Sequence, residues 1–208
     1  MSAIRDLFVT RLYQASLAGP GFEAFRGELA DAAAMLATED LAGRRWCKAH
    51  SYGGYTSYAS LGDLPTRATV FGELKRRLDR HATAAAKAFD LDLGAGRLVL
   101  DSLWVSVLKP ASGHSGHIHP HSVLSGTTYV SVPLGAGALR LEDPRLPLMM
   151  AAPPRRGDAP ESSRTFVTLE PQEGDVFIWE SWLRHEVLPG VAKSPRISVS
   201  FNYAWAGG

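Results

Sequence analysis

The chain has 208 residues, 45% of them apolar, and its 22 basic side chains nearly balance its 21 acidic ones. This composition excludes a disordered chain and is typical of one compact, soluble domain, which we expect to span residues 1–208. The formal net charge of +1 and the lack of like-charge runs disfavour a nucleic-acid partner, because nucleic-acid binding needs a surface that neutralises phosphates.

Targeting and cysteine signals are equally sparse. The apolar run at 176–179 is far shorter than the roughly 20 residues of a membrane span, so no membrane partner is expected. Arg5, Asp6 and Arg11 interrupt any apolar core of a secretory signal, and we therefore expect a cytoplasmic protein. Cys47 is the single cysteine, which excludes an internal disulfide and a multi-cysteine zinc or iron–sulfur site.

The first part of the chain, residues 1–93, is expected to be mainly helical. Residues 22–42 repeat apolar side chains every three to four positions, and residues 71–89 do the same, so each segment predicts an amphipathic helix. Gly43 follows the first pattern, where a left-handed stop residue is typical. The glycine- and hydroxyl-rich residues 51–58 between the two patterns predict a connection without helical structure.

From residue 94 onward the chain is rich in β-branched and aromatic residues, interrupted by turn residues every eight to twelve positions. This rhythm is typical of an antiparallel sandwich or barrel. Helices followed by strands predict an α+β fold in which the helices buttress one sheet. The candidate strands are residues 97–108, 117–121, 126–132, 138–141, 165–169, 175–179 and 196–203.

Residues 144–160 form a segment that cannot join a sheet. Five prolines within 17 residues predict a long loop, because proline cannot donate a backbone hydrogen bond. Loops of this length inside compact domains are often functional, so a lid over a site and a mobile surface insertion both remain open.

Four of the seven histidines fall within residues 113–121. Side chains at i and i+2 of a strand leave the same face about 7 Å apart at Cα, so His117 and His119 can converge on one metal ion. His119 and His121 meet the same condition less well, since a proline lies between them. His185 follows a strongly apolar candidate strand and is the expected third ligand. Three imidazoles suit Fe(II), zinc or copper, whereas exposed polar residues at a turn are the alternative interpretation.

The last candidate strand has two different faces. Residues at odd positions from 197 to 203 are apolar, whereas Arg196, Ser198, Ser200 and Asn202 are polar. If the polar face points into a cavity, Arg196 and Ser198 can grip a carboxylate. A solvated outer face is the alternative.

The order His-x-His, a strand, His185 and then Arg196-x-Ser198 resembles the iron(II)- and 2-oxoglutarate-dependent dioxygenases. More closely, the chain resembles a bacterial and phage branch of the 2-oxoglutarate/iron(II) oxygenases. The matching segments are residues 7–10, 53–57, 117–120, 124–130, 142–145, 173–175, 182–185 and 196–202.

The resemblance implies a double-stranded β-helix, a jelly-roll, at residues 94–208, buttressed by the helices of residues 1–93. It implies Fe(II) and 2-oxoglutarate as cofactors in the oxidation of an organic substrate, either a small molecule or a peptide. The implied metal ligands are His117, His119 and His185, and the implied 2-oxoglutarate anchors are Arg196 and Ser198. Tyr129, Trp104 and Trp179 are candidate residues on the substrate side, and pairing of sheet edges into a homodimer is a further expectation.

One residue departs from the pattern of that family. The second metal ligand is usually a carboxylate, but His119 occupies its position. A neutral imidazole leaves the site one unit more positive and weakens its preference for Fe(II) over zinc or nickel. Two alternatives therefore stay open: a three-histidine cupin-like metalloenzyme that does not use 2-oxoglutarate, and a non-catalytic jelly-roll that binds a metal or a carboxylate.

Overall fold

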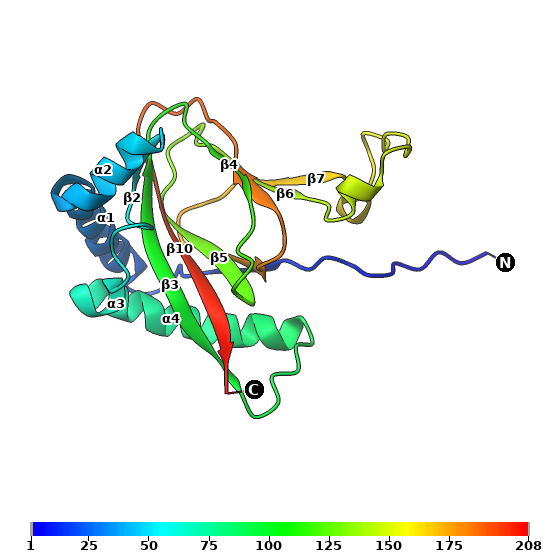
Figure 1. Cartoon of the computed structure of the whole chain (residues 1–208), viewed down its shortest axis with the longest axis horizontal. Coiled ribbons are helices and arrows are strands. Elements are labelled where there is room, and N and C mark those ends of the chain that lie inside the picture. The colour runs from blue at the N-terminus through cyan, green and yellow to red at the C-terminus, as the bar shows by residue number, and fades with distance from the viewer. Residues whose placement is uncertain (1, 208) are drawn as a thin grey trace.

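The computed structural model describes residues 2–207 and combines helices with two antiparallel sheets. The helices lie on one side of the long strands, and the strand pair that carries the long loop projects from the other side (Figure 1). A mixed fold of helices and antiparallel strands is confirmed. The helices are α1 Phe22–Glu39, α2 Leu41–Ala49, α3 Leu64–Arg67 and α4 Thr69–Ala88.

The larger sheet has six strands in the order β1-β8-β5-β10-β3-β2, and the smaller has four in the order β4-β9-β6-β7. Every neighbouring pair within both sheets is antiparallel. The larger sheet contains β1 Tyr13–Ser16, β8 Asp175–Glu180, β5 Leu124–Ser131, β10 Arg196–Ala206, β3 Arg97–Leu108 and β2 Gly54–Thr56. The smaller contains β4 His114–His117, β9 His185–Val187, β6 Leu139–Glu142 and β7 Phe166–Leu169.

Alternation along the strands gives the larger sheet two buried faces. On β8, Val176 and Ile178 pack with the helices, whereas Phe177 and Trp179 point between the sheets. Both faces are apolar because both are covered, so the segment reads as a continuous apolar run. The helical side holds the larger core, and the space between the sheets holds a smaller one beside the cavity described below.

The prediction of one helix over residues 22–42 with a stop at Gly43 is wrong. The helix α1 ends at Glu39, and α2 begins two residues later. The carboxylate of Asp40 accepts a hydrogen bond from the Gly43 amide at 2.9 Å and so caps the start of α2. Gly43 is buried in the first turn of this second helix. A side chain at this position would collide with the side chains of Asp40 and Ser60.

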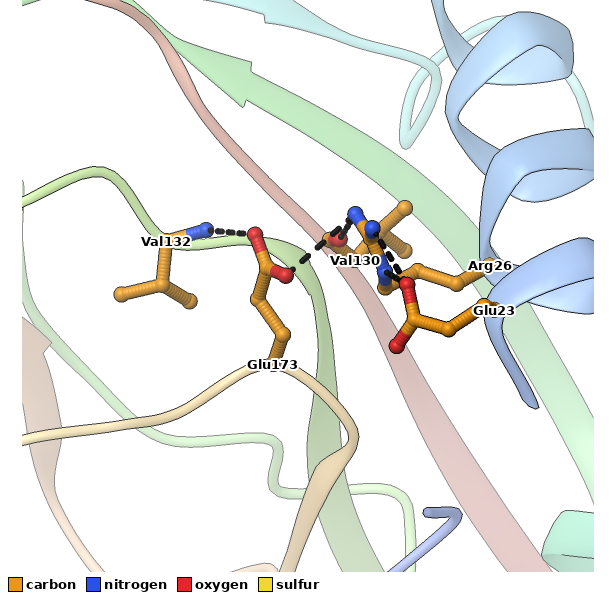
Figure 2. Close-up of polar contacts among 5 residues, drawn as sticks. All are labelled: Glu23, Arg26, Val130, Val132 and Glu173. Carbon is orange, nitrogen blue, oxygen red and sulfur yellow. Dashed lines mark hydrogen bonds and ion pairs between the residues drawn. The ribbon is translucent and has the colours of Figure 1, made fainter. Parts of the chain in front are cut away.

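A polar contact fixes α1 to the sheet beneath it (Figure 2). The Arg26 guanidinium lies 3.3 Å from the Glu173 carboxylate and donates a hydrogen bond to the Val130 carbonyl at 3.4 Å. The other oxygen of Glu173 accepts from the Val132 amide at 3.2 Å. Glu173 stands in the turn before β8, so one carboxylate links the helix, the end of β5 and this turn.

The 3₁₀ turns Leu146–Leu148 and Glu161–Ser163 interrupt the connection between β6 and β7. The long loop expected over residues 144–160 lies in this connection, which extends away from the sheets (Figure 1). Across residues 2–207, no helix combines the length and the apolar character that a bilayer crossing requires.

Candidate active site

A cavity opens between the two sheets. Its wall is built by the inward side chains of β3, β5, β8 and β10 on one side and by β4, β6 and β9 on the other. The cavity brings together all eight of the residues that the sequence predicted for metal, 2-oxoglutarate or substrate. They are His117, His119, His185, Arg196, Ser198, Tyr129, Trp104 and Trp179.

Two of the histidines face each other across a strand pair. His117 is the last residue of β4 and His185 is the first of β9, and they are register partners with ring centroids 4.3 Å apart. Strand pairing therefore sets the separation of two candidate ligands that are far apart in the sequence.

His119 reaches the same point by a different route than expected. The predicted strand over 117–121 is wrong, because β4 ends at His117 and a turn follows, closed by the hydrogen bond from the Ser122 amide to the His119 carbonyl. Pro120 cannot continue a strand ladder, which explains the early end. The His119 amide donates to the Ser181 carbonyl at 3.0 Å. The His119 ring centroid lies 5.0 Å from that of His117 and 5.3 Å from that of His185. His121 is exposed and lies outside the cavity.

The three imidazoles offer ligand atoms that all lie within 4.8 Å of one another. His117 Nδ1 lies 2.8 Å from the Ser115 carbonyl, and His185 Nδ1 lies 2.9 Å from the Leu183 carbonyl. A carbonyl oxygen only accepts, so both Nδ1 atoms carry the hydrogen and donate it. The lone pair of each ring therefore sits on Nε2, and the backbone fixes the orientation that a metal ligand needs.

The electrostatics of the cluster favour neutral rings. Burial, followed by the neighbouring histidines, lowers the pKa of His185 to about 3 and that of His119 to about 4. Burial also lowers the pKa of His117. At neutral pH the three rings are uncharged, which is the form that coordinates a cation. Three neutral imidazoles whose ligand atoms lie this close together fit a divalent metal ion.

Arg196 is the positive charge of the cavity wall. Its side chain is 6% exposed, and its Nη1 donates to the Gly137 carbonyl at 2.8 Å. Its guanidinium carbon lies 5.2 Å from the centre of the Tyr129 ring. Its Nε is buried without a partner, and none of the ion pairs found within residues 2–207 includes it. A buried, uncompensated guanidinium calls for an anion in the cavity.

The strand that carries Arg196 has the two faces that its sequence indicates. Val199, Phe201 and Tyr203 pack into the core under the helices, whereas Ser198 and Ser200 line the cavity. The hydroxyl of Ser198 is thus placed on the same wall as Arg196, two residues along β10.

Aromatic side chains form the rest of the wall. The Trp104 ring packs between Tyr58 and His119, with centroid distances of 5.1 and 5.6 Å. The Trp179 ring contacts His185 edge-on at 4.7 Å. All the candidate substrate-side residues therefore lie against the cavity.

Sequence reasoning missed His114 and Tyr52, which also line the cavity. Their rings are in edge contact at 5.6 Å, and the His114 ring lies 4.3 Å from that of His117. His114 belongs to the same run of histidines, but its odd spacing from His117 hid it, because β4 has an irregular register between the two. Residues 144–160, the candidate lid, contribute no side chain to the wall of this cavity.

Comparison with known families gives a match over the strands that build this cavity. Residues 102–202 match the family model described as "Putative 2OG-Fe(II) oxygenase", where 2OG denotes 2-oxoglutarate. The match begins in β3 and ends in β10, so it includes every candidate metal and carboxylate ligand. Among curated protein sequences, none matches the chain.

Solved structures with similar folds cover nearly the whole chain. A Pseudomonas putida prolyl-4-hydroxylase is 16% identical, with 95% of this chain and 94% of that chain covered and a TM-score of 0.59. AviO1 from Streptomyces viridochromogenes is 18% identical, with 94% and 90% covered and a TM-score of 0.60. HygX from Streptomyces hygroscopicus, solved with nickel and 2-oxoglutarate bound, is 17% identical, with 94% and 82% covered and a TM-score of 0.58. At these identities the likeness concerns the fold.

Proposed function

Because residues 102–202 match the family model of the 2OG-Fe(II) oxygenases, we propose that this chain is a 2-oxoglutarate-dependent dioxygenase that oxidises an organic substrate at an Fe(II) centre. The observation that carries the proposal is that a candidate metal site and a candidate carboxylate site lie in one cavity. Three neutral imidazoles converge at one place, and a buried guanidinium without a counter-ion lines the same cavity.

We further propose that the two sheets form a double-stranded β-helix and that the chain is one domain. The strand orders β8-β5-β10-β3 and β4-β9-β6-β7 support this, because consecutive strands from β3 to β10 alternate between the two sheets except at the β6–β7 pair. Residues 1–93 supply the helices that cover the larger sheet, and residues 94–208 supply the β core.

In this proposal His117, His119 and His185 hold Fe(II). Arg196 and Ser198 hold the carboxylate of 2-oxoglutarate that lies farther from the metal. A guanidinium and a hydroxyl match a carboxylate in charge and in hydrogen-bond donors. When bound, Fe(II) and 2-oxoglutarate supply the oxidation of the substrate by O₂, with 2-oxoglutarate converted to succinate and carbon dioxide.

The contribution of the chain is orientation and exclusion of water. The carbonyls of Ser115 and Leu183 hold the tautomers of His117 and His185, so their Nε2 atoms stay unprotonated. The Gly137 carbonyl holds Nη1 of Arg196 and leaves Nε free to bind the anion. Trp104, Tyr129 and Trp179 keep the cavity apolar around these polar groups, which strengthens each electrostatic contact.

The test is anaerobic titration of the Fe(II)-loaded protein with 2-oxoglutarate. We expect a weak visible charge-transfer band and, with O₂ and substrate, succinate formation. Arg196→Ala should lose 2-oxoglutarate binding and keep the metal. Absence of both the band and succinate would contradict the proposal.

The two alternative functions give different results in the same experiment. A three-histidine enzyme that does not use 2-oxoglutarate keeps its activity in Arg196→Ala. A non-catalytic binding protein forms no succinate, and its His119→Asp variant gains uncoupled decarboxylation of 2-oxoglutarate.

A further inference from the structure

The cavity contains more positive charge than its own residues compensate. Within residues 2–207, no aspartate or glutamate lines it, and Arg196 is its charged member. Glu186 and Glu142, which stand on the neighbouring strands β9 and β6, are paired with Arg140 and Arg184. Any negative charge in the cavity must therefore come from ligands.

The proposed metal and 2-oxoglutarate leave a net positive charge in the cavity, a count that rests on the proposed function. A divalent metal and Arg196 bring three positive charges, and 2-oxoglutarate brings two negative ones. One positive charge remains because His119, a neutral ring, stands where a carboxylate would remove it. Among buried side chains an uncompensated charge is costly, so a further anion is favoured.

A hydrogen-bond donor without a partner marks where this anion can sit. The indole Nε1 of Trp179 is buried and makes no hydrogen bond, although a buried unpaired N–H costs about 1–3 kcal/mol. The residue is 2% exposed, and its ring contacts His185 at 4.7 Å, which places it at the metal end of the cavity.

The donors for 2-oxoglutarate lie elsewhere on the wall. Trp179 pairs with Ser125 of β5, which pairs with Asn202 of β10. Arg196 is six residues from Asn202 along β10, about 20 Å at 3.3 Å per residue. Trp179 and Arg196 therefore line different ends of the cavity. The carboxylate of 2-oxoglutarate that binds Arg196 therefore leaves the unpartnered Trp179 N–H available to a second ligand.

We propose that the cavity binds a second, singly charged anion next to the three histidines, with the Trp179 indole N–H as its hydrogen-bond donor. The anion is either a free inorganic ion or a carboxylate group of the organic substrate. These two sources share one negative charge and an acceptor atom, and they differ in size and shape.

The test uses the protein loaded with Co(II), whose visible absorption reports the ligands of the metal. Under anaerobic conditions the protein is first saturated with 2-oxoglutarate and then titrated separately with chloride, azide, formate and acetate. We expect a saturable spectral change with at least one anion. Tighter binding of chloride or azide identifies a free inorganic ion, and tighter binding of formate or acetate identifies a substrate carboxylate.

Two variants test the residues. His119→Asp supplies the missing negative charge within the cavity and should weaken anion binding at least about tenfold, because like charges at short range repel strongly. Trp179→Phe keeps the ring and removes the N–H, and should weaken binding about three- to tenfold. Circular dichroism and thermal unfolding show that each variant is folded, and anion affinity is compared only between samples with the same metal content.

The outcomes separate this inference from the proposed function. No spectral response to 2-oxoglutarate contradicts the proposed function. A response to 2-oxoglutarate with no response to any of the anions overturns the second anion site alone. Anion binding that is unchanged in both His119→Asp and Trp179→Phe also overturns it, because the anion would then bind away from these residues.

Discussion

His117 and His185 are direct register partners in one antiparallel strand pair, with ring centroids 4.3 Å apart. The hydrogen bonds of the sheet hold the backbones of both residues, so the pair exists before any metal arrives. Each ring is also oriented by a backbone carbonyl within its own segment. This preorganisation lowers the cost of binding a metal ion.

Removal of one of these ligands should abolish tight metal binding. We expect His185→Ala to lower the affinity for Fe(II) or zinc by at least about 100-fold, since loss of an outer-sphere partner alone costs 10–100-fold. Isothermal titration and metal analysis of the purified protein measure this. His121→Ala is the matched control, because His121 is exposed, belongs to the same run of histidines and lies outside the cavity. Equal losses in the two variants would place the metal elsewhere.

The stability of the metal-free protein should fall as the pH decreases from about 6.5 toward 4. Burial lowers the pKa of His185 to about 3 and that of His119 to about 4, whereas in the unfolded chain both have a pKa near 6.5. In this range the unfolded chain binds more protons, so low pH favours unfolding by up to about 1.4 kcal/mol per pH unit for each histidine. Urea titrations with a chelator at several pH values measure the slope.

A variant separates the contribution of the cluster from that of the other titrating groups. His119→Asn removes one of the protonation sites and should reduce the slope between pH 6.5 and 4. A slope that is the same with and without His119 would show that this histidine is as readily protonated in the folded protein as in the unfolded chain.

The sequence was most informative where one side chain pattern repeats over a whole element. The alternation from Ile197 to Tyr203 predicted both the strand and its two faces, because the apolar face has to be covered by the helices. Helix α4 was also found, since its buried residues recur every three to four positions. The convergence of His185 with His117 and His119 came from the resemblance and the residue types, and the structure brings the three rings together.

Elements that depend on tertiary contacts were missed. The strands β1, β2 and β9 have three or four residues each and no repeat long enough to detect. The break between α1 and α2 depends on the side chain of Asp40, whose partners Tyr55 and Ser60 lie 15 and 20 residues away in the sequence. His114 was overlooked because an irregular register, which no sequence period reveals, brings it onto the cavity wall.

Close packing beneath the cavity predicts a contrast between two glycines. A Cβ at Gly126 on β5 would lie 2.5 Å from the Phe201 ring and 2.6 Å from the Phe177 carbonyl oxygen, so Gly126→Ala should destabilise the fold by about 1–3 kcal/mol. Gly27 on α1 has open space around its Cβ position, and Gly27→Ala should stabilise the helix by about 0.5–1 kcal/mol. Thermal unfolding of both variants tests the contrast, and a neutral Gly126→Ala would show that the sheet yields at this point.

Asp40 should contribute to stability through its ionised carboxylate. It accepts hydrogen bonds from the Gly43 amide at 2.9 Å, the Tyr55 hydroxyl at 2.9 Å and the Ser60 hydroxyl at 2.5 Å. Burial alone raises its pKa, but the hydrogen bonds together outweigh burial, and the pKa lies below its ordinary value of 3.8. Asp40→Ala should therefore cost about 1–3 kcal/mol at neutral pH, since it removes a helix cap and leaves two hydroxyls without their acceptor.

The pH dependence of this loss follows from the direction of the shift. A carboxyl whose pKa is lower in the folded protein stabilises the fold at pH values above its unfolded pKa, and this contribution disappears as the pH falls through the folded value. The difference in unfolding free energy between the parent and Asp40→Asn should thus be constant above about pH 5 and shrink below about pH 4. Asp31→Asn, an exposed change on α1, is the control and should show little difference at either pH. A difference for Asp40→Asn that stays constant down to acid pH would show that the charge of Asp40 does not stabilise the start of α2.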